Sequence, residues 1–414
     1  MNLSEWIEKI QKVHPVSWDL GLDRVGEVGR RLDVLRPAQT TFLVAGTNGK
    51  GSTCEVLAQL CNAYGQSFGK ATSPFLLRYN EQFIVNNNEV EDDEIISAFK
   101  KIEVARAEIS LTYFEFSALA ALIIFKQSNV DVAILEIGLG GRLDAMNIVD
   151  PDVSIITQIA IDHEQWLGSD RESIAKEKAG IYRSGRPCIL VDNDPPQALF
   201  EEAVKSNANI WLLNRDFVYE RGQLKVSGQE FDIRDTQLPV QSVLGAILAF
   251  EQAGYPLDQT KIDSAVRSSE LFGRFQQVAV TGSQGQDLVL ILDVAHNPNA
   301  AQLLLENLQK HEIDHVQAIV GVYQDKDIDQ MFKILSPIVK GWHFPKLDVE
   351  RASSVEKLSH HLSHCCGLEG NTYAKVADAY DAATKGCESG GVVLVFGSFS
   401  MVASMLNHLN NKTN

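Results

Sequence analysis

Cysteine is scarce in this sequence and is not spaced for metal binding. Six cysteines are present among 414 residues, and none of them forms a C-x-x-C pair. A structural zinc site usually needs such pairs, so we do not expect one. So few cysteines in so long a chain also do not suggest a disulfide framework.

Long apolar runs and an excess of positive charge are missing as well. The longest apolar run covers residues 118–125, far short of the roughly 20 residues that a membrane-spanning helix needs. The first six residues lack the basic and apolar regions of a signal peptide.

Lysine and arginine number 37 against 54 aspartates and glutamates, which gives a formal net charge of −17. We therefore expect a soluble cytoplasmic protein that binds neither nucleic acid nor membranes. No apolar heptad marks a dimer seam, so a monomer is the default expectation.

Short runs rich in valine and isoleucine alternate along the chain with longer amphipathic stretches. The runs are continuously apolar, as expected of strands buried on both faces of a parallel sheet. They cover residues 41–45, 130–137, 153–159, 188–191, 288–292, 318–322 and 392–396, and the helix-like stretches include residues 53–63, 115–126 and 299–310. This alternation predicts an α/β fold of the doubly wound kind.

A polar, glycine-rich segment at residues 281–287 separates a longer first block of the chain from a shorter second block. Such a segment is typical of a hairpin as well as of a domain boundary. We place the boundary slightly earlier, at Gly273. The sequence thus predicts an N-terminal domain of residues 1–272 and a smaller C-terminal domain of residues 273–414.

The strongest local motif follows the first apolar run, where residues 44–53 read Val-Ala-Gly-Thr-Asn-Gly-Lys-Gly-Ser-Thr. Glycines at such a strand-to-helix turn let the backbone approach a phosphate closely, and the N–H groups of the positive helix end hold the anion. Lys50 adds a positive charge. The generic pattern G-x-x-x-x-G-K-[ST] is not met, because Gly51 separates Lys50 from Ser52 and Val44 replaces the first glycine. An ordinary glycine-rich turn is the alternative, and nucleotide binding is the interpretation that we favour.

The segment 46–52, Gly-Thr-Asn-Gly-Lys-Gly-Ser, resembles the ATP loop of the Mur ligase superfamily. More narrowly, the chain resembles the family of bacterial bifunctional dihydrofolate synthase/folylpolyglutamate synthase. The resemblance covers nearly the whole chain, with further matching motifs at residues 19–25, 111–115, 135–144, 162–163, 166–168, 176–181, 273–276, 293–298, 325–327 and 396–399.

The resemblance implies a fold, an activity and a set of ligands. It implies a P-loop-type, doubly wound, mostly parallel N-terminal domain that binds ATP and pterin, and a smaller Rossmann-like C-terminal glutamate-ligase domain. The implied activity is ATP-dependent addition of L-glutamate to dihydropteroate, forming dihydrofolate, and to tetrahydrofolate, forming polyglutamates, through an acyl phosphate. ATP and Mg²⁺ at two sites are the implied cofactors. A monofunctional folylpolyglutamate synthase and a degenerate nucleotide-binding paralogue without ligase activity stay open as alternatives.

Three polar residues follow predicted strands, where open α/β sheets place their ligands. Glu136 ends the run 130–137, while Ser73 and His163 follow two other apolar stretches. A carboxylate at such a place is costly unless it is paired or bound to a cation. The resemblance implies that Ser73, Glu136 and His163 bind magnesium, although a histidine ligand is atypical for that ion.

Other implied site residues have ordinary structural explanations. Spacing alone favours a solvated Lys178, whereas the resemblance implies that it is carbamylated and acts as a ligand to a second metal. Thr112 and Glu115 fit a capping box. The resemblance implies catalytic roles for Lys50, Lys178 and His296, and nucleotide contacts from Thr47, Asn48, Gly49, Lys50, Gly51, Ser52, Arg274 and Asp293. It implies substrate contacts from Ser17, Trp18, Asp19, Thr112, Tyr113, Phe114, Glu115, Leu143, Asp144 and Ala145, and the stretches 17–19 and 112–115 among these would contact the pterin.

In the second block, Asn297 is also a candidate N-cap before Pro298, and Arg274 a candidate surface ion pair. The chain departs from the family pattern at four positions, which are Phe75, Met146, Val243 and Gln324. Val243 falls where an adenine-contacting Asn is usual, and losing that amide predicts weaker ATP binding.

Overall fold

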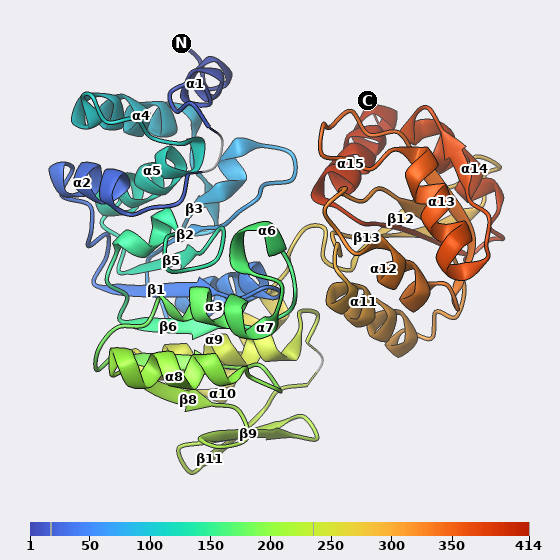
Figure 1. Cartoon of the computed structure of the whole chain (residues 1–414). Coiled ribbons are helices and arrows are strands. Elements are labelled where there is room, and N and C mark those ends of the chain that lie inside the picture. The colour runs from blue at the N-terminus through green and yellow to red at the C-terminus, as the bar shows by residue number, and fades with distance from the viewer. Residues whose placement is uncertain (17–18, 235, 414) are drawn as a thin grey trace. The chain divides into compact units, whose positions relative to one another are not determined.

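The structure is a computed structural model that describes residues 1–16, 19–234 and 236–413. The chain divides into two compact units, Met1–Glu270 and Leu271–Asn414, and Figure 1 shows a separate sheet with flanking helices in each. In the described part of the chain, no helix combines the length and apolar character that crossing a bilayer requires.

The first unit is built on an eight-stranded sheet with the order β4-β3-β2-β5-β1-β6-β7-β8. Strands β2, β5, β1, β6, β7 and β8 are parallel, and only the β3–β4 edge is antiparallel. The predicted mostly parallel sheet is therefore confirmed. Its strands are β1 (Thr40–Ala45), β2 (Phe68–Ala71), β3 (Phe83–Val85), β4 (Asn88–Glu89), β5 (Val132–Glu136), β6 (Val153–Ile156), β7 (Pro187–Leu190) and β8 (Asn209–Leu212).

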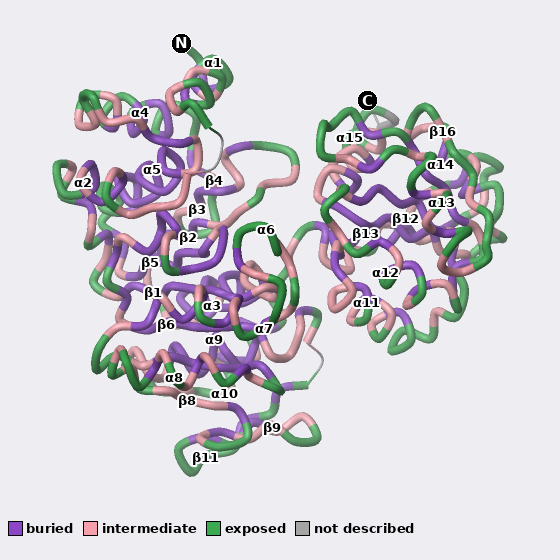
Figure 2. The backbone as a smooth tube through the Cα atoms, viewed as in Figure 1, coloured by how far each residue is buried: buried purple, intermediate pink, exposed green. Residues whose placement is uncertain are grey.

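Helices cover both faces of this sheet. Helices α3 and α9 pack on one face with α10 against α3, while α5, α7 and α8 pack on the other and α1, α2 and α4 pack around α5. Leu43 and Phe42 on β1 point to opposite faces, so both are buried, as Figure 2 shows for the central strands. The helices are α1 (Leu3–Ile10), α2 (Asp23–Arg31), α3 (Lys50–Ala63), α4 (Asp92–Arg106), α5 (Tyr113–Gln127), α6 (Glu164–Leu167), α7 (Arg171–Ala179), α8 (Gln197–Ser206), α9 (Val240–Gln252) and α10 (Gln259–Ser268), with short 3₁₀ turns η1 (Tyr79–Gln82) and η2 (Ala145–Ile148).

A small antiparallel sheet is appended to the first unit after β8. Its strands are β9 (Phe217–Glu220), β10 (Gln223–Val226) and β11 (Gln229–Asp232), in the order β11-β10-β9. Residues on the central strand β10 alternate between more buried and more exposed positions, as in a strand with one solvated face.

The second unit contains a six-stranded sheet with the order β12-β13-β17-β14-β15-β16, in which only β12 is antiparallel. Helices α11, α12 and α13 pack on one face, and α14 and α15 on the other. The elements are β12 (Gln276–Thr281), β13 (Asp287–Asp293), α11 (Pro298–Lys310), β14 (Val316–Val320), α12 (Ile328–Leu335), β15 (Val339–Pro345), α13 (Val355–Cys366), β16 (Asn371–Tyr373), α14 (Val376–Lys385), β17 (Val392–Phe396) and α15 (Phe399–Thr413).

Two local features refine the sequence-based expectations. Of the two interpretations left open for the segment 281–287, a hairpin and a domain boundary, the structure shows the hairpin, because the segment joins the antiparallel strands β12 and β13. Helix α3 begins at Lys50, three residues before the predicted start, because Gly49 takes up a left-handed conformation (φ +89°) that turns the chain directly into the helix.

Candidate functional site

The glycine-rich loop connects the end of β1 to the start of α3. Gly46 and Gly49 both have positive φ angles, of +146° and +89°, which glycine adopts without the strain that a Cβ would cause. The first bond of the helix runs from the Thr53 N–H to the Gly49 carbonyl at 2.9 Å. The N–H groups before Thr53 are therefore not used by the helix, and they lie at its positive end. This arrangement can bind an anionic group.

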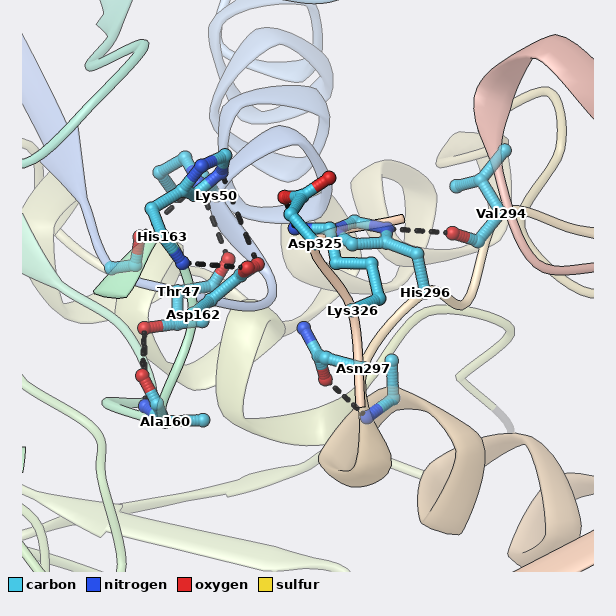
Figure 3. Close-up of polar contacts among 12 residues, drawn as sticks. Thr47, Lys50, Ala160, Asp162, His163, Val294, His296, Asn297, Asp325 and Lys326 are labelled. Atoms are coloured by element: carbon cyan, nitrogen blue, oxygen red, sulfur yellow. Dashed lines mark hydrogen bonds and ion pairs between the residues drawn. The ribbon is translucent and has the colours of Figure 1, made fainter. Parts of the chain in front are cut away.

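Lys50 and Thr47 both bind backbone groups in or beside this loop. The Lys50 ammonium donates to the Gly46 and Thr47 carbonyls at 3.1 and 3.2 Å. The Thr47 hydroxyl donates to the Ala160 carbonyl and accepts from the Ala160 N–H, both at 3.0 Å (Figure 3). The loop is thereby tied to the segment that carries Asp162 and His163.

Two of the three predicted magnesium ligands lie side by side. Glu136 is the last residue of β5 and is buried, and its carboxylate accepts the Ser73 N–H at 3.3 Å. His163 precedes α6 with a left-handed backbone (φ +53°), and its N–H donates to the Asp162 carboxylate at 2.8 Å. Within residues 1–16, 19–234 and 236–413, no three His, Cys, Asp or Glu side chains are grouped so as to hold a metal ion by themselves.

Lys178 is buried, so the interpretation of a solvated lysine is wrong. The side chain projects from α7 to the phosphate loop, where its amine donates to the Gly46 carbonyl at 2.8 Å. Burial, and then the positive charge of Lys50, lower the pKa of Lys178 to about 7. A large fraction of this amine is therefore neutral, and hence nucleophilic, near pH 7.

The predicted capping box at the start of α5 is confirmed, and it also has a partner outside the helix. The Glu115 carboxylate accepts the Thr112 N–H at 2.7 Å, and the Thr112 hydroxyl accepts the Glu115 N–H at 3.2 Å. Arg24 contacts Glu115 at 3.2 Å and Asp19 at 2.6 Å. Burial raises the pKa of Glu115, and the Thr112 N–H and Arg24 oppose that rise. Ser17 and Trp18 lie outside the described residues.

The stretch that begins α5 packs against the loop that follows β5. A Cβ on Gly138 would lie 2.5 Å from the Phe114 ring, so only glycine leaves room for this aromatic side chain. Tyr113 is also partly buried, and burial raises its pKa to about 12. The stretch 112–115, which is predicted to contact the substrate, is thus placed against the loop after β5.

Asp144 organises the loop after β5 from within. Its carboxylate accepts the Leu139 N–H at 2.8 Å and the Met146 N–H at 2.9 Å, and the side chain is buried. Burial raises the pKa of Asp144 to about 6 in spite of these bonds. Ala145 is buried beside it and Leu143 is half-buried.

In the second unit, Asp293 is a buried carboxylate that interacts electrostatically with Arg274. The Asp293 carboxylate ends β13 and accepts the N–H groups of Phe275 and Ala295, both at 2.8 Å. Burial raises its pKa, and the charge of Arg274 opposes that rise. The Arg274 guanidinium also lies 5.7 Å from the centre of the Phe399 ring. The positive charge of Arg274 thus stabilises the ionised form of a buried carboxylate.

His296 and Asn297 occupy the turn between β13 and α11. The His296 Nδ1 lies 2.9 Å from the Val294 carbonyl (Figure 3), and a carbonyl only accepts, so Nδ1 carries a proton and the neutral ring has its lone pair on Nε2. The predicted N-cap is confirmed, because the Asn297 side chain accepts the Ala300 N–H at 2.9 Å and Pro298 opens the helix.

The four positions that depart from the family pattern have varied surroundings. Phe75 packs edge-on against Tyr79, with the ring centres 5.9 Å apart, and Met146 is buried. The Gln324 side chain donates to the Ala352 carbonyl at 3.0 Å. The Val243 side chain lies in the core, and its neighbour Ser242 donates instead to the Gly49 carbonyl of the phosphate loop, at 3.1 Å.

Two residues that contact the phosphate loop were not identified from the sequence, Ser242 and Thr157. Thr157 follows β6, so the signal used for Ser73 and Glu136, a polar residue after an apolar run, could have found it. Ser242 is far from the loop in sequence and carries no local signal of this kind.

Comparison with known proteins places this site in a family. The Mur ligase middle domain matches residues 44–244, and the Mur ligase glutamate ligase domain matches residues 273–399. Dihydrofolate synthase/folylpolyglutamate synthase from Escherichia coli K12 is 39% identical over 98% of this chain and 94% of its own length, and that from Haemophilus influenzae is 37% identical over 97% and 96%.

Solved structures agree in fold over the whole chain. E. coli FolC in complex with DHPP and ADP superimposes with a TM-score of 0.93 at 36% identity, covering 100% of this chain and 99% of that one. The bifunctional folylpolyglutamate synthase/dihydrofolate synthase with Mn, AMPPNP and L-glutamate bound gives 0.91 at 38% identity, covering 99% and 98%. The chain therefore belongs to the dihydrofolate synthase/folylpolyglutamate synthase family of Mur ligases, and it is an ATP-dependent ligase.

Proposed function

We propose that this ligase joins L-glutamate to dihydropteroate, forming dihydrofolate, and to tetrahydrofolate, forming polyglutamates. The observation that carries the proposal is the meeting of Lys50 and the buried Lys178 at one carbonyl of the phosphate loop, that of Gly46. The ligands named in the two related structures, DHPP and ADP in one and Mn, AMPPNP and L-glutamate in the other, support it.

The nucleotide phosphates would lie on the loop between β1 and α3. The N–H groups before Thr53 would bind phosphate oxygens, and Lys50 would leave its loop carbonyls to contact the β/γ-phosphates. The residues proposed for this role are Thr47, Asn48, Gly49, Lys50, Gly51 and Ser52. In the second unit, we propose that Arg274 and Asp293 also contact the nucleotide.

Ser73, Glu136 and His163 would hold Mg²⁺. One buried carboxylate with few other protein ligands suits this ion, because Mg²⁺ prefers oxygen and keeps several waters. Bound there, Mg²⁺ would offset the negative charge of the phosphoryl group.

Lys178 would become an anionic ligand through carbamylation. The reaction adds the neutral amine to CO₂ and releases one proton, leaving a carbamate on the side chain. The lowered pKa of Lys178 supports this step, because only the unprotonated amine attacks CO₂. The carbamate would supply oxygens to a second Mg²⁺.

The acceptor would lie along the stretches 112–115 and 143–145. The Phe114 ring offers a flat apolar face on which a pterin can stack. Tyr113, Leu143, Asp144 and Ala145 would complete this side, together with Thr112 and Glu115 at the start of α5. Arg24 holds Asp19 near the same capping box, which supports a pterin contact from Asp19.

The chemistry would proceed in two steps. A carboxylate oxygen of the acceptor takes the γ-phosphoryl group of ATP, which gives an acyl phosphate and ADP. The amine of glutamate then attacks the acyl carbon and loses a proton, and phosphate leaves as the amide forms. His296 would orient this amine or accept its proton through Nε2. Positioning and charge neutralisation dominate phosphoryl transfer, so most of the named groups bind and orient. We expect the active protein to be a monomer.

The test is ADP formation by the purified protein with ATP, Mg²⁺ and glutamate, adding dihydropteroate or tetrahydrofolate separately. Turnover that requires glutamate and occurs with each of the two acceptors supports the proposal. Turnover with tetrahydrofolate alone would leave a monofunctional folylpolyglutamate synthase. ATP hydrolysis that ignores both acceptors and glutamate would overturn the choice of substrates.

A further inference from the structure

Two buried hydroxyl groups bind carbonyl oxygens of the phosphate loop. The Thr157 hydroxyl donates to the Asn48 carbonyl at 2.7 Å, and it lies 3.3 Å from the Ala45 carbonyl, which is already bound by the Thr157 N–H at 2.9 Å. The Ser242 hydroxyl, from the first turn of α9, donates to the Gly49 carbonyl at 3.1 Å. Each of the two residues is 2% exposed, so water does not compete for these bonds.

Holding these carbonyls fixes the N–H groups of the residues that follow them. A trans peptide unit is planar, and its C=O and N–H point in opposite directions. The bond from Thr157 to the Asn48 carbonyl therefore sets the direction of the Gly49 N–H. In the same way, the bond from Ser242 helps to fix the Gly49 carbonyl, and with it the direction of the Lys50 N–H; this carbonyl also accepts the Thr53 N–H at 2.9 Å and the Thr53 hydroxyl at 3.0 Å. Both N–H groups precede the first bond of α3, which begins at Thr53.

The glycines of the loop lie where these hydroxyls approach. A Cβ on Gly46 would lie 1.7 Å from the Thr157 hydroxyl oxygen, and a Cβ on Gly49 would lie 2.8 Å from that of Ser242. Both distances are too short for a side chain. The glycine pattern thus serves the contact with the two hydroxyls as well as the positive φ angles of the loop.

We infer that Thr157 and Ser242 are positioning residues for ATP, which orient the Gly49 and Lys50 N–H groups toward the phosphates. This inference rests on the proposal that the loop binds the ATP phosphates. Neither residue needs to touch the nucleotide. Their contribution therefore concerns the polyphosphate part of the ligand, and the affinity for adenosine alone is independent of it.

The test compares Thr157→Val, which keeps the shape of the side chain, and Ser242→Ala with the matched control Ser154→Ala. Ser154 is a buried residue on β6, the strand that leads to Thr157, and it pairs with Cys188 on β7 rather than with the phosphate loop. Calorimetry would measure the Kd for ADP and for adenosine. We expect each hydroxyl loss to raise the Kd for ADP about 3- to 10-fold. The Kd for adenosine should stay within about 2-fold, and Thr157→Ser should restore ADP binding.

The outcomes separate the inference from the proposal beneath it. Lys50→Ala tests the proposal itself, because it removes a charge from the loop. If Lys50→Ala leaves ADP binding unchanged, the loop does not hold the phosphates and the proposed nucleotide site is wrong. If Lys50→Ala weakens ADP binding but Thr157→Val and Ser242→Ala behave like Ser154→Ala, the inference is overturned. Equal losses for ADP and adenosine would also overturn it, since they would report a general disturbance. Ser242→Ala carries the test if Thr157→Val does not fold.

Discussion

Lys50 and Lys178 donate to the same oxygen atom, the carbonyl of Gly46, at 3.1 and 2.8 Å. Two ammonium groups at one acceptor repel each other, and one of them is buried. Loss of a proton from Lys178 relieves this repulsion, because burial and the charge of Lys50 lower the pKa of Lys178 to about 7. The unmodified Lys178 side chain thus destabilises the fold whenever it is protonated.

The pH dependence of folding should therefore reveal Lys178. Its pKa in the folded state, about 7, lies below the value of about 10.4 in an unfolded chain. Between these values the unfolded state binds more protons, so the stability of the wild type rises with pH across this window. We expect Lys178→Met to be more stable than the wild type below pH 7, by on the order of 2–4 kcal/mol. That difference should shrink toward pH 10. Urea unfolding in CO₂-free buffer measures it, and a constant difference across the window would contradict the assignment.

Carbamylation of Lys178 can be tested on the same helix. Lys178→Ala should lower kcat by about 10²–10³-fold, whereas Lys176→Ala should leave it unchanged, because Lys176 is exposed on α7. In ¹³CO₂-equilibrated buffer, the wild type should show a carbamate resonance in its ¹³C NMR spectrum that Lys178→Ala lacks. An unaltered spectrum in that variant would rule out Lys178 as the modified residue.

Gly138 should determine the affinity for the pterin acceptor. A Cβ there would meet the Phe114 ring at 2.5 Å, so Gly138→Ala should displace the ring. We expect the KM for the acceptor to rise about 10-fold, as for about 1.4 kcal/mol of lost contact, with little change in the KM for ATP. Gly26→Ala on α2 is the control, because its nearest neighbour would lie 3.7 Å away. Steady-state kinetics with each substrate varied decides the matter, and equal effects on both KM values would count against a pterin site.

The buried ion pair between Lys70 on β2 and Glu55 on α3 should be sensitive to the loss of one partner. Glu55→Gln leaves the Lys70 charge without its counterion, and we expect a loss of about 3–5 kcal/mol of unfolding free energy. The double variant Glu55→Gln/Lys70→Met should recover much of that loss, because it removes the buried charge. Chemical denaturation of the three proteins measures this. A double variant less stable than Glu55→Gln would show that the charge is not the cause.

Much of the fold could be predicted because local sequence sets it directly. The apolar runs mark the buried strands, and Thr112 with Glu115 and Asn297 with Pro298 mark two helix starts through local hydrogen bonds. Glu136 could be predicted as a site residue because it is a carboxylate at the end of the apolar strand β5. The burial of Lys178 could not be predicted in this way, because the charged residues next to it, Lys176 and Glu177, are typical of a solvent-exposed helix. Its burial depends on a contact with Gly46, 132 residues away. Ser242 depends on a similar distant contact, with Gly49 at a separation of 193 residues.

The contact between Ser242 and Gly49 links the ligand to the assembly of the first unit. The loop receives one of its hydrogen bonds from α9, so its full geometry exists only after the sheet and the helices on both sides of this contact have formed. Any molecule that binds the completed loop stabilises the folded state of this unit by mass action. Saturating ADP should consequently delay heat-induced unfolding of residues 1–270 as one cooperative block, including the distant hairpins of β9–β11.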